Sequence, residues 1–517
     1  MDSSVSVLKF GGTSVGNGER IRHVAHVIAN KLHDPEEAFP IVVVSAMSGV
    51  TDQLLRIAHY AWTHQYNECE QELHALKQRH IEAAELAIHN HEGQRVLLHE
   101  LEQAFSALER DVASVGEQFI ALNDGIDPLN EQSHAEVQLI EPNDRTGVLD
   151  AALNGGSMVA AWGERLSVLL LAAAARDIGV QAAPVRQEVI ITRQPRGEAP
   201  ESPGVVVGAE PLSEETRTNA QALLSPLVEQ RVVPIAAGFI GRTITGIVTT
   251  LGRNGSDYSA SVIGAALDCV EVSIYTDVDG ILTADPRIVP NVRLLPELSY
   301  AEAARLSWFG AKVLHPRTLM PLAYRNIPVR VRNTFRPHRR GTVVGPEGRL
   351  PSGAAAIAIR RHLALITVES TDMFGIPENA GQVFALAARA GAAPVAICSS
   401  SGYHLSFLVE EQASDSVVAL LQHDMGTWRV LCRRGLASCA CIGSGFTADP
   451  MSPARAITAL ARERIPVITQ GVSEPGIILI VEDEDNERAL RCLHRDLIAP
   501  VIPLVRSHAQ EKRREVI

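Results

Sequence analysis

The chain has 517 residues, of which 46% are hydrophobic and 21% are charged, and its formal net charge at pH 7 is −13. This balance is typical of a globular protein, and the length predicts about three domains. The excess of acidic residues argues against a nucleic-acid-binding surface.

Cysteine usage and apolar runs give expectations about the compartment. The seven cysteines are scattered, and Cys439 and Cys441 lie too close together for a Cys-x-x-Cys motif. Such a set indicates reduced thiols. Because Met-Asp-Ser-Ser leads directly into the first strand, we expect no signal peptide. The longest apolar run, Val168 to Ala175, is far shorter than the ~20 residues of a membrane span. We therefore expect a cytoplasmic protein without membrane contact, in which this run is a buried helix.

The first strand-to-helix junction is rich in glycine. The run Val5 to Phe10 predicts a buried strand, and from Glu19 onward apolar residues recur at helical spacing. Gly11 and Gly12 lie between them, where backbone N–H groups favour anions, and Lys9 adds a compact positive charge. The spacing of a P-loop is absent. Taken alone, the segment fits an ordinary turn with a solvated lysine as well as a phosphate-binding loop.

The pattern after this junction alternates apolar strands with amphipathic helices up to residue 340 or so, which predicts an α/β sheet sandwiched by helices. Within it, residues 52–111 are rich in Glu, His, Gln and Leu and contain no proline. This stretch is expected to be strongly helical.

A second glycine- and hydroxyl-rich loop, Leu251 to Ala260, follows a strand predicted at Val232 to Ala236. Asp257 can cap the helix after the loop, and Arg253 offers a planar fork for a carboxylate. Taken alone, Asp257 fits a helix cap better than a catalytic carboxylate. Arg253 and Ser256 beside it favour the catalytic interpretation. Two such loops on one chain favour an enzyme that holds a nucleotide and a small anionic acceptor face to face.

The last third of the chain repeats itself. The proline- and glycine-containing segment Gly341 to Gly353 predicts a linker. Beyond it a β-α-β-β-α order occurs twice, with the same offset from Val395 to Val467 as from Val409 to Val481. The segment Gly443 to Ala448 mimics a dinucleotide-binding fingerprint but lacks its strand, long helix and acidic residue, so we expect no NAD.

Six motifs occur in order along the chain. They are Lys9–Gly16, Val43–Thr51, Gly163–Ser167, Gly238–Ala260, Tyr275–Arg287 and Phe309–Pro316. Together they resemble the aspartate kinases of the amino-acid kinase family, and the repeat resembles paired ferredoxin-like ACT domains, which sense small molecules. The resemblance covers nearly the whole chain. It implies an amino-acid kinase fold with a mainly parallel sheet in 1–340, a helical insertion at about 52–111, a linker at 341–356, and ACT domains at 357–434 and 435–517.

The resemblance implies ATP-dependent phosphorylation of the side-chain carboxylate of L-aspartate to 4-phospho-L-aspartate, with Mg²⁺ accompanying ATP and no tightly bound metal. A carboxylate is already an anion at neutral pH, so positioning and charge neutralisation carry this reaction without a general base. By resemblance the catalytic residues are Lys9, Asp257 and Lys312.

The other site residues that the resemblance implies form two groups. Those expected to bind aspartate are Ser45, Thr51, Glu164, Arg253 and Ser256, with Glu164 meeting the α-ammonium and Arg253 a carboxylate. Those expected to bind the nucleotide are Lys9, Gly11, Gly12, Ser14, Thr276, Asp277, Leu282, Arg287 and Lys312. Two alternatives stay open, since Glu164 also fits a surface salt bridge and Thr51 a simple helix cap. Asp285 is expected to be a turn residue and not a metal ligand, and His315 is expected to fix a turn.

Three positions depart from the family pattern. Asn254 stands where glycine is usual, Leu282 where tyrosine is frequent, and Ala161-Trp162 where Ser-Phe is common. Asparagine tolerates a positive φ. No catalytic charge is lost, so we expect an active enzyme.

The paired ACT domains imply feedback by lysine, threonine or both, and a homodimer or higher homo-oligomer. The expected effector-binding residues are Met373, Phe374, Gly375, Ser400 and Ser401. Ala396 is apolar where lysine-sensing relatives often carry an acidic residue, which weakens the case for lysine. The competing hypotheses are another kinase of the same fold and a non-catalytic amino-acid-sensing regulator; the length argues against a fused homoserine dehydrogenase.

Overall fold

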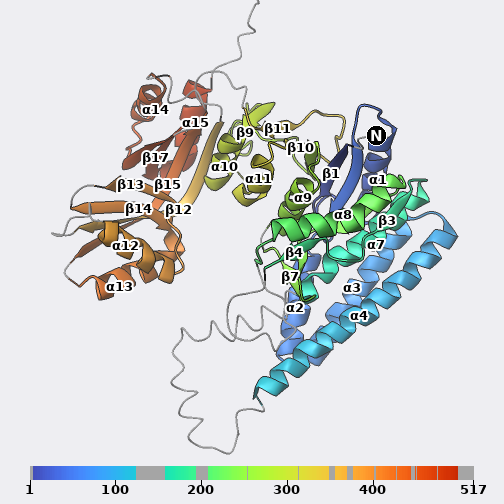
Figure 1. The fold of residues 1–517 in the computed structure, drawn as a ribbon. Helices are drawn as coiled ribbons and strands as arrows, with labels where there is room; N and C mark the ends of the chain where they lie inside the picture. Colours follow the sequence, from blue (N-terminus) through green and yellow to red (C-terminus); the bar gives the residue numbers. More distant parts are fainter. Residues whose placement is uncertain are drawn as a thin grey trace, which may run out of the picture. The chain divides into compact units, whose positions relative to one another are not determined.

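The computed structural model describes residues 4–123, 158–193, 208–252, 254–311, 314–347, 356–369, 377–400, 403–426, 428–443, 449, 451–473 and 476–498. The chain divides into two compact units (Figure 1). The first consists of Met1–Ile281, Leu294–Ser307 and Lys312–Arg349, and the second of Leu282–Arg293, Trp308–Ala311 and Leu350–Ile517.

An eight-stranded sheet forms the centre of the first unit, in the spatial order β3-β5-β2-β1-β8-β10-β11-β9. Its strands are β1 (Val5–Phe10), β2 (Phe39–Val44), β3 (Ala182–Pro184), β5 (Val233–Ala237), β8 (Glu271–Thr276), β9 (Glu297–Ser299), β10 (Val329–Asn333) and β11 (Thr342–Gly345). Neighbouring strands are parallel except for β10 and β11. The central strands are apolar runs because helices cover both faces of the sheet, which confirms the predicted mainly parallel α/β fold.

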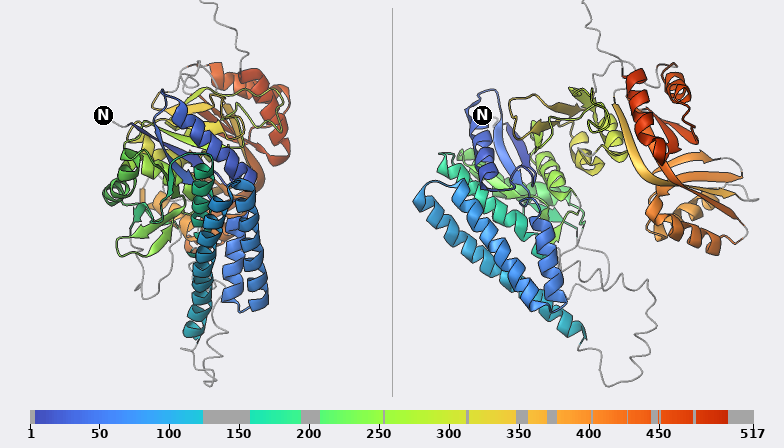
Figure 2. Two further views of the ribbon diagram at one scale, coloured as in Figure 1. Left: turned by 90° about the vertical axis from the view of Figure 1, so that its right-hand side faces the viewer. Right: turned by 180° about the vertical axis from the view of Figure 1, so that it is seen from behind.

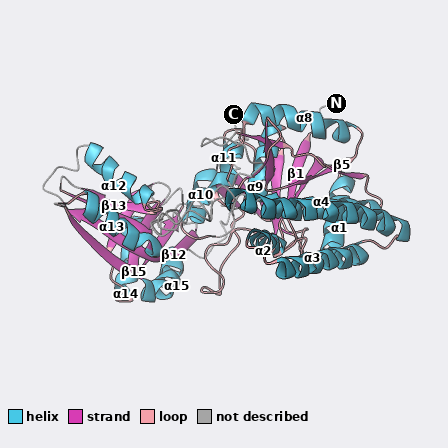
Figure 3. Ribbon diagram, turned by 90° about the horizontal axis from the view of Figure 1, so that it is seen from below, coloured by secondary structure: helices cyan, strands magenta, loops and turns pink. Residues whose placement is uncertain are grey.

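Helices on the two sides of this sheet can be followed in Figure 3. One side carries α1 (Gly18–His33) and α7 (Trp162–Asp177), and the other α8 (Ser213–Glu229) and α9 (Gly255–Ala266). The remaining helices of this part are α10 (Tyr300–Trp308) and α11 (Pro316–Ala323), and a small separate sheet contains β4 (Ile190–Thr192), β6 (Ile240–Thr243) and β7 (Val248–Thr250).

The predicted helical insertion is confirmed as three helices that pack side by side (Figure 2), namely α2 (Val50–Trp62), α3 (Tyr66–Ala87) and α4 (His91–Asn123). The run Val168 to Ala175 is buried within α7, as predicted. By length and composition Met158–Asp177 would pass as a membrane span, but 83% of its apolar window is buried inside the protein. It is therefore a core helix of the α/β unit.

A six-stranded antiparallel sheet forms the second unit, in the order β13-β14-β12-β15-β17-β16. Its strands are β12 (Ala356–Glu369), β13 (Ala396–Ser400), β14 (His404–Glu410), β15 (Arg429–Ile442), β16 (Thr469–Ser473) and β17 (Gly476–Glu482), and its helices are α12 (Pro377–Arg389), α13 (Ser414–Asp424), α14 (Met451–Arg462) and α15 (Asn486–Leu497). The two halves repeat the same order of elements, as the sequence offset predicts.

The boundary predicted between the two ACT repeats differs from the structure. The first half of β12, Ala356 to Arg360, pairs with the end of β15 and contributes Ile357 to the apolar cluster under α14 and α15. The second half of β12 pairs with β14 and packs with α12 and α13. Both repeats therefore share β12 and β15, and residue 434 does not divide them.

The predicted linker is also partly wrong, because Thr342–Gly345 is strand β11 of the first unit. Gly341 has a φ of +70° and a Cβ there would lie 2.0 Å from the Val331 carbonyl oxygen, so this glycine permits the close approach of the backbone to β10 at the start of β11. A turn glycine and a linker glycine give the same signal in a sequence.

Two short segments of the predicted catalytic domain belong to the second unit. Ala284 and Val289 lie in the apolar cluster under α14 and α15, and Thr283 Oγ1 lies 2.9 Å from His494 Nε2. Trp308 Nε1 donates to the Val395 carbonyl oxygen at 2.8 Å. Residues 1–340 are therefore not one continuous folding unit.

Candidate active site

The site residues of the first unit gather where its parallel strands end. Phe10 is aligned with Val44 and with Tyr275, and Val44 with Ala237, while Thr276 is aligned with Asn333. The loops that leave these strands therefore meet at one edge of the sheet. In open α/β sheets this edge is where ligands bind.

Lys9 and Asp257 form a buried ion pair at this edge. Lys9 is 8% exposed, and its Nζ lies 2.5 Å from Asp257 Oδ1. A Cβ on Gly11 would lie 3.3 Å from the same Nζ, so the ammonium lies against the glycine-rich loop. This burial excludes the alternative of an ordinary turn with a solvated lysine.

Asp257 is not the helix cap that the sequence allows. Helix α9 begins at Gly255, and the residue before it, Asn254, has a φ of +57° and makes no side-chain capping bond. Asp257 is the third residue of the helix, where its carboxylate meets Lys9 and the positive end of the helix dipole. Asn254 adopts the positive φ that asparagine was expected to tolerate.

The glycine-rich loop is held against the neighbouring strand end. The Gly11 N–H donates to the Tyr275 carbonyl oxygen at 3.3 Å, and a Cβ on Gly12 would lie only 2.9 Å from the Ala46 carbonyl oxygen. The loop after β1 and the loop after β2 thus touch through their backbones.

We expect Gly12→Ala to lower kcat at least 10-fold, because the added Cβ must separate these two loops and overpacking of this kind costs about 1–3 kcal/mol. Gly16→Ala is the matched control, since the nearest atoms to its Cβ lie at an ordinary 3.4 Å. Steady-state rates of the two variants check this expectation; equal rates would contradict it.

The Ser14 hydroxyl makes its hydrogen bonds within the protein. The side chain is fully buried, and its Oγ lies 2.6 Å from Thr334 Oγ1 and donates to the Tyr275 carbonyl oxygen at 3.4 Å. Ser14 therefore anchors the loop to the ends of β8 and β10. The sequence analysis missed Thr334, which follows a strand but lies in none of the six motifs.

Glu164 is a buried carboxyl in the first turn of α7. It is 3% exposed, and it accepts hydrogen bonds from the backbone N–H groups of Ala46 and of Glu164 itself. Its Oε2 has no hydrogen-bond partner among the described residues. Burial raises the pKa of Glu164 to about 8, against the opposing effect of those N–H groups and of Lys9. The alternative of a surface salt bridge is excluded.

The close approach of α7 to the loop after β2 places this carboxyl. A Cβ on Gly163 would lie 2.7 Å from Ala46 Cβ, so only glycine permits the contact. This explains why glycine precedes Glu164 in the chain.

Burial of Glu164 predicts a pH dependence of stability. Its pKa rises from 4.5 to about 8 on folding, so between these values the folded state keeps a proton that the unfolded state has lost. The free energy of unfolding should therefore fall as the pH rises through this interval. Glu164→Gln removes the contribution, so urea titrations from about pH 5 to about pH 8 should show a smaller loss in the variant. Equal losses in both proteins would contradict the assignment.

The predicted hydroxyl residues lie at the same edge. Ser45 is half-buried, and its N–H donates to the Phe10 carbonyl oxygen at 3.1 Å. Thr51 is the second residue of α2, whose cap is Gly49 with a φ of +79°, so the alternative that Thr51 is only a cap is wrong. Ser256 is buried against Gly238, where a Cβ would lie 2.7 Å from Ser256 Cβ.

The nucleotide-binding prediction divides between the two units. Thr276 ends β8 and donates to Asp277 Oδ1 at 3.2 Å. Leu282 and Arg287 lie in a segment of the second unit, and the Arg287 guanidinium is 83% exposed and pairs with Asp285 at 2.6 Å. Asp285 also accepts from the Arg287 N–H, which confirms its role in a turn.

An asparagine and two arginines hold the loop after Asp277 by hydrogen bonds and ion pairs. Asn333 donates to the Asp277 carbonyl oxygen at 3.2 Å and to Asp279 Oδ1 at 2.7 Å. Arg336 and Arg339 pair with Asp279 at 3.1 and 2.6 Å. Sequence analysis gave no sign of these partners, because they are far from Asp279 along the chain.

Several predicted residues lie outside the described residues. They are Arg253, Lys312, Met373, Phe374, Gly375 and Ser401. Ser400 is described as the last residue of β13. His315 caps α11 by accepting from the Arg317 N–H, in keeping with its predicted local role.

Comparisons with known proteins identify the two parts of the chain. Residues 4–333 match the model of the amino acid kinase family, and residues 440–497 match an ACT domain model. Among curated relatives, the bifunctional aspartokinase/homoserine dehydrogenase 2 of Arabidopsis thaliana is 31% identical over 95% of this chain, and aspartokinase 2 of the same plant is 28% identical over 94%. The chain spans about half the length of the bifunctional relatives, at 50%, and 83% of aspartokinase 2.

Solved structures agree with this assignment. Escherichia coli aspartokinase III in complex with aspartate and ADP is 27% identical, with a TM-score of 0.73 over 96% of this chain and all of that one. The aspartate kinase of Clostridium acetobutylicum, 20% identical with a TM-score of 0.68 over 95% of this chain and 99% of that one, shares the fold. The resemblance noted in the sequence is confirmed. With a family model matched over most of its length, this chain belongs to the amino acid kinase family.

Proposed function

We propose that this chain is an aspartate kinase that transfers the γ-phosphoryl group of Mg·ATP to the side-chain carboxylate of L-aspartate. One observation carries the proposal. At one edge of the sheet lie a buried lysine–carboxylate pair and a buried carboxyl, one oxygen of which has no hydrogen-bond partner in the described part of the chain. The lysine suits a phosphoryl group, and the carboxyl suits an ammonium group. Escherichia coli aspartokinase III, which shares the fold at 27% identity, was solved with aspartate and ADP.

The proposed role of each residue follows from the charge of the group that it meets. Lys9 neutralises charge on the transferring phosphoryl group, and Asp257 fixes its ammonium at 2.5 Å. Gly11 and Gly12 allow the phosphates to approach the loop backbone, and Mg²⁺ arrives with the nucleotide. Glu164 receives the α-ammonium of aspartate, which satisfies the Oε2 that lacks a partner among the described residues. The acceptor carboxylate then attacks phosphorus while ADP leaves, and no proton has to be removed.

The second unit is proposed to regulate this activity by binding an amino acid, and the proposed assembly is a homodimer or higher homo-oligomer. Its support is the duplicated β-α-β-β-α order and the ACT match. Lysine and threonine are the candidate effectors; E. coli aspartokinase III was also solved with lysine and aspartate. A reducing compartment such as the cytoplasm fits the seven cysteines, all of which are free thiols.

ADP release by the purified chain with Mg·ATP tests the proposal. We expect ADP release when L-aspartate is present. With L-glutamate, or with water as the only acceptor, we expect none above background. Lysine, threonine and both together are added in parallel to identify the effector. Release that is the same without aspartate would contradict the proposal.

A further inference from the structure

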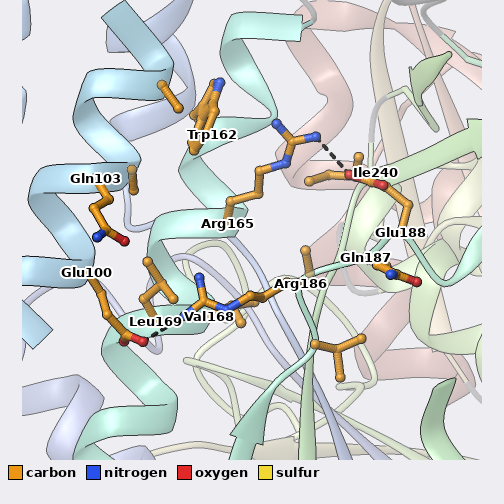
Figure 4. Close-up of a pocket in the computed structure, with 14 residues that line it drawn as sticks. Glu100, Gln103, Trp162, Arg165, Val168, Leu169, Arg186, Gln187, Glu188 and Ile240 are labelled. Carbon is orange, nitrogen blue, oxygen red and sulfur yellow. Dashed lines mark hydrogen bonds and ion pairs between the residues drawn. The ribbon is translucent and has the colours of Figure 1, made fainter. Parts of the chain in front are cut away.

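A cavity of about 320 Å³ lies in the first unit (Figure 4). Helices α4 and α7, the segment 185–188, the end of β5 at Ala237 and the start of β6 line it. None of the residues predicted to bind ATP or aspartate belongs to its lining. Its volume is at the lower end of the range for small-molecule sites, ~300–1,000 Å³.

The cavity combines an apolar wall with two opposed charge pairs. Val168, Leu169, Val185 and Ile240 contribute buried aliphatic side chains. Such a wall can take the side chain of a small apolar ligand without hydrogen bonds.

The charged groups come from three different parts of the chain. Arg186 Nη2 lies 2.6 Å from Glu100 Oε1, and Arg165 Nη2 lies 2.7 Å from Glu188 Oε1, as the dashed lines in Figure 4 show. The Arg165 guanidinium also stacks over the Trp162 ring, 4.9 Å from its centroid. Two cations and two anions balance, which favours a zwitterionic ligand over a simple anion or cation.

One oxygen of this cluster is unsatisfied. Glu100 Oε2 is buried and has no hydrogen-bond partner among the residues that the structure describes. A buried acceptor without a donor costs about 1–3 kcal/mol, more when charged. The cavity therefore has a place for a donor, and an ammonium group suits a carboxylate oxygen best.

We propose that this cavity binds a free α-amino acid with an apolar side chain. The α-ammonium donates to Glu100 Oε2, and the α-carboxylate accepts from Arg165 and Arg186, which retain donors beyond the two bonds given above. The side chain packs on Val168, Leu169 and Ile240. Binding at this place is independent of whether the chain phosphorylates aspartate, so the two proposals can fail separately.

Calorimetric titration of the full chain with L-leucine, L-isoleucine and L-methionine tests the proposal. We expect saturable binding that Glu100→Gln weakens at least 10-fold, since the variant loses the charge on the oxygen that receives the ammonium. The matched control is Glu102→Gln, two residues along α4, whose carboxylate is 60% exposed and pairs with Lys77. It should bind like the unchanged chain.

Two further measurements distinguish binding in this cavity from amino-acid binding in the second unit. Ala104→Phe fills the space from α4 and should abolish the binding, and 4-methylpentanoate, which is leucine without its ammonium, should bind at least 10-fold more weakly. No saturable binding of the three amino acids, or binding that Glu100→Gln and Ala104→Phe leave unchanged, would overturn the proposal.

Discussion

Lys9→Met is expected to lower kcat for aspartate phosphorylation by about 10³-fold while the protein stays folded. Lys9 is the buried cation at the end of β1, held by Asp257 and lying against Gly11. Without it, the charge that develops during phosphoryl transfer loses a preorganised positive partner. Because Asp257 is left unpaired, the free energy of unfolding should also fall by about 3 kcal/mol.

A second buried lysine provides a control that separates the loss of stability from the loss of kcat. Lys31 is 7% exposed, and its Nζ also lies 2.5 Å from a carboxylate oxygen, that of Glu37. It comes from the last turn of α1, next to the segment that enters β2, away from the strand ends that carry the site. Lys31→Met should lower stability in a similar way and change kcat less than about 3-fold. A similar loss of kcat in both variants would mean that Lys9 acts only through stability.

Glu164→Gln is expected to raise KM for aspartate about 100-fold and to leave KM for ATP unchanged. The carboxylate oxygen that lacks a partner among the described residues is the proposed receptor for the α-ammonium, and an amide loses the charge that binds it. Since the pKa of Glu164 is raised to about 8, kcat/KM for aspartate should rise with pH up to that value in the unchanged chain.

Glu302→Gln is the matched control, because Glu302 is also buried but accepts from the Ser299 N–H at 2.9 Å. Ser299 ends β9 at the opposite edge of the sheet from the site, since β9 is parallel to β11 and β11 is antiparallel to β10. It should leave both KM values within about 3-fold. If Glu164→Gln changed the two KM values equally, the carboxyl would be a structural group of α7 and not part of the aspartate site.

The sequence predicted the sheet because its strands depend on local patterns. Buried parallel strands are continuous apolar runs, as in Val5–Phe10 and Phe39–Val44. The pairing of Lys9 with Asp257 was expected only from the resemblance of their loops to those of the aspartate kinases, and the structure places the two charged groups 2.5 Å apart. The repeat in the second unit was equally visible, since it depends only on spacing.

The parts that the sequence did not predict depend on contacts between distant segments. Ser14 meets Thr334 across 320 positions of the chain, and Thr283 meets His494 across 211, so neither partner has a local signal. Gly341 could not be assigned from the sequence for a different reason: glycine is common both in a loop between two paired strands and in a linker between domains. Arg339 likewise pairs with Asp279 across 60 positions of the chain, and no local pattern marks that partner.

The central claim is that the acceptor is the side-chain carboxylate of aspartate, and trapping the product tests it most directly. The purified chain is incubated with Mg·ATP, L-aspartate and hydroxylamine, which converts an acyl phosphate into a hydroxamate that mass spectrometry identifies. The account predicts aspartate β-hydroxamate, formed in step with ADP and absent in Lys9→Met. ADP release without any hydroxamate, or a hydroxamate on the α-carboxylate, would contradict it.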